Sequence, residues 1–158
     1  MGRGGYRRAV RFSHTTVYVN RVAETLAFWE RAFGVEPRLV DPGGDYAELD
    51  TGGTRLAFVS HRWVVTLFDA SYRESDADRR PIGVEVGFEV GDVDAAVERA
   101  AAAGARVLAE PVDRPGGGRV ARVRDGDGLI VALSSPTPPG DPRNPPPAGP
   151  PGPPGPPA

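Results

Sequence analysis

The sequence lacks cysteine and lysine, and it contains only two histidines and one methionine. Without cysteine the chain can form no disulfide, no thiolate metal site and no cysteine nucleophile. Its 19 basic residues are all arginine, and its formal net charge is −2. Domains that bind nucleic acid normally carry a basic face. We therefore expect no nucleic-acid partner.

Long apolar runs are also absent. No stretch approaches the roughly 20 apolar residues that cross a bilayer. The basic start, MGRGGYRRAVRF, lacks the apolar segment of a secretory signal. Hydrophobic content of 39% and charged content of 25% are ordinary for a globular domain. We expect a cytoplasmic protein with no membrane partner.

What the sequence does contain is an internal repeat. Ser13–Ser60 and Val84–Ser134 both read as a strand, a helix that stops at glycine, and three short strands. A shift of 71 residues places His14 on Glu85. A repeat of this kind determines the architecture, so it takes precedence over local assignments.

Hydrophobic periodicity supports this pattern in both copies. In SHTTVYV and VEVGFEV, apolar and polar residues alternate as in a strand with one buried face. The helices predicted at 22–33 and 93–103 carry apolar residues at three- to four-residue spacing. Turn residues then separate the strands predicted at 37–40, 45–50, 54–60, 106–108, 119–124 and 129–134.

Composition changes at both ends of the repeat. Thirteen of the 18 prolines lie beyond Leu133, which predicts an extended segment without a core. The predicted organisation is a flexible N-terminus, a first module, a connector, a second module and a disordered Pro/Gly-rich tail, at residues 1–9, 10–60, 61–81, 82–134 and 135–158.

The predicted fold class is α+β, with two tandem βαβββ modules. A four-stranded sheet with a helix on one face leaves its other face open. Two such sheets can form a half-open curved sheet with the helices outside and the polar faces lining a cleft. Concave sites shared by two modules are common places for ligands.

The sequences of the two modules resemble those of the vicinal oxygen chelate superfamily. This superfamily includes glyoxalase I, bleomycin-resistance proteins, extradiol dioxygenases and fosfomycin-resistance enzymes. The resemblance covers residues 12–136 and rests on five segments: SHTTVYV, FWERAFG, YAELDTGGTRLAFVSH, EVGFEVGDVDAAVERAAAAGA and RVRDGDGLIVALSSP. It implies the half-open curved sheet described above, in proteins that are either metal enzymes or binding proteins.

The resemblance also implies where a metal would be held. In the metal-dependent members, ligands come from the first and last strands of each module. Those positions match His14 and Glu85 on the opening strands and Ala57 and Ala132 on the closing strands. A catalytic divalent site normally needs about three protein ligands. With methyl groups at two positions, the metal site is predicted to be vacated.

His14 and Glu85 keep several interpretations. His14 could be a ligand, a general base or a hydrogen-bonded pocket histidine. Glu85 lies between two valines, where a carboxylate is costly to bury unless it is paired. It could bond His14, or form an ion pair with Arg55 or Arg122 that bridges the modules.

Aromatic residues supply further candidates. Tyr18, Tyr46 and Trp63 could form walls that hold a flat, partly apolar ligand, although ordinary packing also explains them. His61 follows the last strand of the first module, and we predict that it lies on the surface or at a hinge. The predicted ligand-binding residues are His14, Thr16, Tyr18, Tyr46, Glu48, Arg55, Trp63, Glu85 and Arg122.

These observations favour a metal-free small-molecule binding protein similar to the bleomycin-resistance branch. It would need no cofactor, would hold an aromatic or amphipathic ligand, and would form a homodimer. The alternative is an enzyme (lyase, isomerase or dioxygenase) with one divalent metal on His14 and Glu85 plus Glu48 or His61. Metal-free acid–base catalysis by His14 and Glu85 is a third possibility.

Overall fold

The computed structural model describes residues 12–68, 71–115 and 117–136. The predicted N-terminal segment, and the predicted tail beyond residue 136, lie outside the described residues. The first module consists of β1 (His14–Val19), α1 (Val22–Phe33), β2 (Pro37–Val40), β3 (Tyr46–Leu49) and β4 (Arg55–Ser60), and α2 (His61–Leu67) follows it directly.

The second module repeats this order. It consists of β5 (Glu85–Glu89), α3 (Val93–Ala102), β6 (Arg106–Asp113), β7 (Arg119–Arg124) and β8 (Ile130–Ser134). The strands form two sheets with orders β1-β4-β3-β2 and β5-β8-β7-β6. The predicted α+β fold with two βαβββ modules is confirmed.

Strand register confirms that the two copies are equivalent. In the first sheet Thr16 of β1 pairs with Ala57 of β4. In the second sheet Gly87 of β5 pairs with Ala132 of β8. Because Thr16 and Gly87 are related by the 71-residue shift, Ala57 and Ala132 occupy equivalent places in the two modules.

Two elements differ from the prediction. The β6 strand runs to Asp113 rather than ending at Leu108, and Asp113 pairs with Arg119 across the glycine-rich turn. The longer strand contains Pro111, which is tolerated because β6 is an edge strand. The start of the predicted connector forms α2, where the Ser60 hydroxyl accepts a hydrogen bond from the Trp63 N–H.

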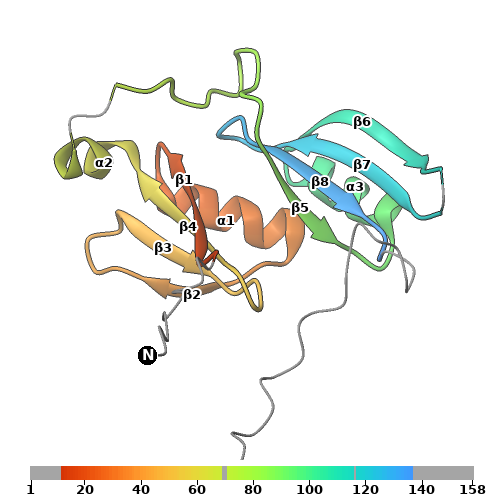
Figure 1. Ribbon diagram of the computed structural model, residues 1–158, viewed down its shortest axis with the longest axis horizontal. Helices are drawn as coiled ribbons and strands as arrows, with labels where there is room; N and C mark the ends of the chain where they lie inside the picture. The colour runs from red at the N-terminus through yellow and green to blue at the C-terminus, as the bar shows by residue number, and fades with distance from the viewer. Residues whose placement is uncertain (1–11, 69–70, 116, 137–158) are drawn as a thin grey trace, which may run out of the picture.

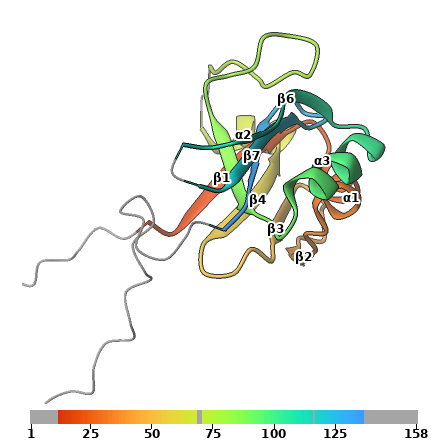
Figure 2. The ribbon, with the colours of Figure 1, turned by 90° about the vertical axis from the view of Figure 1, so that its right-hand side faces the viewer.

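The hydrophobic core is shared by both modules. Helices α1 and α3 pack against each other, and Figures 1 and 2 show both on the same side of the two sheets. The Trp29 ring of α1 is fully buried and makes edge contacts with Phe33, Phe58 and Phe88. Since Phe88 belongs to β5, the first helix packs directly against the second module.

Each sheet therefore has a helix face and an opposite face, which we call the polar face. Among the described residues, no helix has the length and hydropathy needed to cross a bilayer.

Candidate functional site

The edge strands β1 and β5 face each other between the two sheets, and two cavities lie along this seam. The first, called the aromatic cavity here, has a volume of about 270 Å³. Its walls come from β1, the start of α2, the connector and β5, and they include Tyr18, His61, Tyr72, Ser75, Val84 and Val86.

Three rings form one wall of the aromatic cavity. The Tyr18 and Tyr72 ring centroids are 5.2 Å apart, and the His61 ring stacks on Tyr72 at 5.7 Å. The His61 Nδ1 and the Tyr72 hydroxyl are hydrogen-bonded at 2.7 Å. Burial raises the pKa of the Tyr72 hydroxyl, with a smaller contribution from Glu74. The hydrogen bond between His61 and Tyr72 therefore holds two of the three rings of this wall in place.

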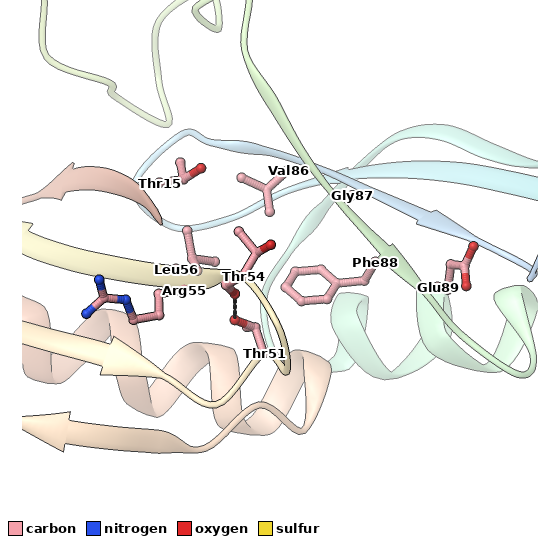
Figure 3. Close-up of a pocket in the computed structure, with 9 residues that line it drawn as sticks. All are labelled: Thr15, Thr51, Thr54, Arg55, Leu56, Val86, Gly87, Phe88 and Glu89. Carbon is pink, nitrogen blue, oxygen red and sulfur yellow. Dashed lines mark hydrogen bonds between the residues drawn. The ribbon is translucent and has the colours of Figure 1, made fainter. Parts of the chain in front are cut away.

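The second cavity, called the threonine cavity here, has a volume of about 390 Å³. In Figure 3 the Phe88 ring points toward the turn that carries Thr51 and Thr54, and the Thr51 hydroxyl donates to the Thr54 carbonyl at 2.6 Å. Thr15 and Val86 line both cavities, so the two are neighbouring sections of one groove.

A buried carboxylate lies on the polar face of the first sheet. Glu48 accepts hydrogen bonds from the Tyr46 hydroxyl at 2.8 Å, from Arg55 at 3.3 Å and from Arg38. The Arg38 hydrogen bond is the largest of the effects that hold the pKa of Glu48 below its usual range. Burial and the Glu48 hydrogen bond raise the pKa of Tyr46.

The second sheet carries a more exposed ion pair. Glu85 accepts a hydrogen bond from Arg122 Nε at 2.8 Å, so of the predicted partners Arg122 is the one that it meets. Both residues belong to the second module, and the predicted bridge between modules is wrong for this pair. The His14 ring is exposed and is hydrogen-bonded to the neighbouring Ser13 hydroxyl at 2.7 Å, whereas Glu85 is bonded to Arg122.

The predicted ligand-binding residues are thus distributed over several places. Thr16 and Tyr18 line the aromatic cavity, and Arg55 lines the threonine cavity. Trp63 packs edge-on against Tyr46 with ring centroids 6.2 Å apart. The remaining predicted residues line neither cavity: His14, Tyr46, Glu48, Trp63, Glu85 and Arg122.

The side chains at the implied metal positions do not fit a catalytic divalent cation. Ala57 and Ala132 present methyl groups, and the oxygens of Glu48 and Glu85 already accept hydrogen bonds from arginine. Within residues 12–68, 71–115 and 117–136, no three histidine, aspartate or glutamate side chains gather as a metal site would require.

Sequence reasoning missed the connector side of the groove. His61, predicted at the surface or at a hinge, is half-buried and lines the aromatic cavity, as do Tyr72 and Ser75. Residues 71–84 form neither helix nor strand, so no periodicity could indicate which of them face inward. The one usable signal was Tyr72, the sole aromatic residue in this segment.

The loop between β7 and β8 joins the modules beside the groove. Asp125 is 3% exposed and accepts a hydrogen bond from the Trp29 indole N–H at 3.0 Å. Burial raises the pKa of Asp125 to about 6, against hydrogen bonds from Leu129 and Trp29 that lower it. Asp127 accepts from the Thr25 hydroxyl at 2.6 Å. Two carboxylates of the second module thus hold the first helix.

Comparison with known proteins agrees with this architecture. The model of the Glyoxalase/Bleomycin resistance protein/Dioxygenase superfamily matches residues 11–133. The chain is 47% identical over 53 residues to "Putative glyoxylase CFP32" of Mycobacterium tuberculosis, a match that covers 34% of this chain and 20% of that protein. The match with the Mycobacterium bovis protein of the same name has the same extent. The matched region therefore spans about a fifth of the length of these curated relatives.

Solved structures share the fold. A glyoxalase-related enzyme from Fulvimarina pelagi has a TM-score of 0.68 at 20% identity, over 80% of this chain and 88% of that chain. TioX from Micromonospora sp. ML1 has a TM-score of 0.60 at 25% identity, over 80% of this chain and 98% of that chain. With the family model matching most of its length, the chain belongs to the Glyoxalase/Bleomycin resistance protein/Dioxygenase superfamily.

Proposed function

We propose that this protein binds an aromatic or amphipathic small molecule without a metal ion, in the groove between β1 and β5, and acts by sequestration or carriage. The observation that carries the proposal is the aromatic cavity, whose walls combine tyrosine and histidine rings with aliphatic side chains. Pockets that bind small molecules are concave, largely apolar and supplied with a few polar groups.

Charge compensation at Glu48 and Glu85, two of the candidate metal ligands, supports binding without metal. A metal ion would have to displace Arg38 and Arg55 from Glu48, or Arg122 from Glu85. These guanidinium groups already provide the positive charge that the carboxylates require, and bonds of this type are stronger than neutral hydrogen bonds.

The neighbouring threonine cavity supports a ligand with a polar part. Thr15, Thr51 and Thr54 supply hydroxyl groups to its lining, and it continues from the aromatic cavity through Thr15 and Val86. An amphipathic ligand could therefore place a flat apolar part in the first cavity and a polar extension in the second.

A thermal-shift screen of aromatic metabolites and antibiotics tests the proposal, because a ligand that binds only the folded state raises the melting temperature. Val84 lines the aromatic cavity and is 54% exposed, so Val84→Trp should fill the cavity without overpacking the core and should abolish the shift. Val65 on α2 has a similar exposure of 59%, and Val65→Trp is the matched control that should retain it.

Two results would contradict the proposal. One is a screen in which no compound stabilises the protein. The other is a metal analysis that finds about one manganese, iron, nickel or zinc ion per purified chain, lost on His14→Ala. That second result would favour the metal-dependent enzyme instead.

We further propose that the protein is a homodimer. On the polar face of the second sheet, the Glu85 and Arg122 side chains are exposed. On the edge strand β6 of this sheet, Leu108 and Val112 are also exposed. Symmetric pairing of equivalent surfaces is the commonest way for such faces to be covered. Light scattering should give twice the chain mass of 16.7 kDa, and a single-chain mass would contradict this.

A further inference from the structure

Two buried polar atoms, from residues that line the aromatic cavity, have no hydrogen-bond partner. In the part of the chain that the structure describes, three side-chain nitrogen or oxygen atoms are buried and unpaired: His61 Nε2, Ser75 Oγ and Arg114 Nε. His61 and Ser75 both line the aromatic cavity, whereas Arg114 lies near the β6–β7 turn.

Such atoms are costly to the folded protein. A buried donor or acceptor without a partner loses its hydrogen bonds to water and gains nothing in return. Native proteins therefore leave few such groups unpaired, and each one calls for an explanation. Two unpaired atoms from residues of the same cavity are explained together if a ligand supplies their partner.

The geometry of His61 leaves Nε2 available for this role. Its Nδ1 is already bonded to the Tyr72 hydroxyl at 2.7 Å, and the two rings stack. The imidazole is therefore held in place from one side, while its second nitrogen has no partner. Arg73 also lines the cavity, but it donates to the Arg80 carbonyl at 3.0 Å.

Resting on the function proposed above, we infer that the ligand is a hydroxylated aromatic compound, whose ring packs against Tyr18 and Tyr72 and whose hydroxyl hydrogen-bonds His61 Nε2 and Ser75 Oγ. A hydroxyl can donate and accept at once, so it matches both atoms whichever tautomer His61 adopts. A carboxylate would lose its hydration in this mostly apolar space, and Arg73, which lines the cavity, already donates to the Arg80 carbonyl.

Burial of the two atoms makes the bond worth more than usual. In a typical complex, each polar group must first give up its water, and the net gain is small. Here the protein atoms are already shielded from water, so the loss has occurred on folding. The connector has no regular structure at residues 71–84, so a ligand reaches these atoms by displacing loop side chains rather than a helix or strand.

The test uses 2-naphthol and 2-methylnaphthalene, which differ by a hydroxyl against a methyl group of similar size. Calorimetric titration of the full chain should give about tenfold tighter binding of 2-naphthol, as expected for one or two added hydrogen bonds. Equal affinity for the two probes, or tighter binding of 2-naphthoate than of 2-naphthol, would overturn the inference while leaving the proposed function standing. Failure of every probe to bind would contradict the proposed function itself.

Ser75→Ala and the double variant His61→Phe/Tyr72→Phe locate the effect. Each should remove most of the preference for 2-naphthol and leave the affinity for 2-methylnaphthalene unchanged. Because Ser75→Ala deletes an unpaired buried hydroxyl, the melting temperature of the free protein should be unchanged or higher. Ser71→Ala, an exposed change on the same connector, is the matched control and should preserve the preference. A preference that survives in both Ser75→Ala and the double variant would show that these atoms do not bind the hydroxyl.

Discussion

The two modules have the same strand order and register, yet they treat their carboxylates differently. On the first sheet the Glu48 side chain is 10% exposed and is bound by Arg38, Arg55 and Tyr46. On the second sheet the Glu85 side chain is 44% exposed and is bound by Arg122. In the first module the Trp63 ring of α2 packs edge-on against Tyr46, and among the described residues no helix follows β8. The repeat thus determines the backbone positions of the two carboxylates. The elements that pack over each sheet determine how exposed these carboxylates are.

A second contrast concerns the residue that directly follows the third strand of each module. Asp50 follows β3 and is exposed, whereas Asp125 follows β7 and is buried beneath Trp29. Aspartate at this position is therefore exposed to solvent in the first module. In the second module it is hydrogen-bonded to a helix of the other module.

We expect the largest loss of stability from a substitution in the core between the two modules. Trp29→Ala removes a fully buried ring shared by both modules and should lower the free energy of unfolding by about 3–5 kcal/mol. Trp63→Ala is the control, since Trp63 is 38% exposed and its loss should cost about 1 kcal/mol or less. Denaturant unfolding followed by circular dichroism measures both. Equal losses would mean that the modules fold independently of this contact.

The next effect sharpens the contrast between Asp125 and Asp50. The folded-state pKa of Asp125 is raised from 3.8 to about 6, so its contribution to stability is complete below pH 3.8 and is lost as the pH rises through 6. Relative to Asp125→Asn, the wild type should lose about 2–3 kcal/mol between pH 4 and pH 7. Asp50→Asn removes an exposed carboxylate and should change the free energy of unfolding at neutral pH by about 0.5 kcal/mol or less. A difference curve for Asp125→Asn that is flat between pH 4 and pH 7 would contradict the assignment.

A smaller effect separates the two ion pairs. Glu48→Gln should lower the melting temperature more than Glu85→Gln, because Glu48 is buried with more partners. Since the pKa of Glu48 is lowered, its stabilising contribution is present above the ordinary carboxyl pKa and is lost as the pH falls through the depressed value. Thermal melts at neutral and acidic pH compare the variants. Equal shifts for both variants would remove the distinction between the two faces.

Much of the fold could be predicted because the same pattern of hydrophobic and turn residues occurs twice in the sequence. Alternation in β1 and helical spacing in α1 give local structure, and the second copy repeats both. Gly34 ends α1 with a φ of +68°, which glycine adopts without strain. The extension of β6 past Pro111 was missed, because proline argues against a strand unless the strand lies at an edge.

The candidate site was less accessible to the same reasoning. Tyr18 and Thr16 could be placed because strand alternation assigns each residue to a face. His61, Tyr72 and Ser75 could not, since their positions depend on how an irregular connector folds back over β1. Likewise Glu48 could be placed on a face, but its arginine partners were set by side-chain reach from neighbouring strands.

The central claim is that this groove binds its ligand without a metal ion, and one measurement tests it directly. Titration of 2-naphthol into chelator-treated protein, with and without added manganese, iron, nickel or zinc, should give the same affinity in every case. An affinity that appears only with one of these ions, bound at about one per chain and lost on His14→Ala, would contradict the account.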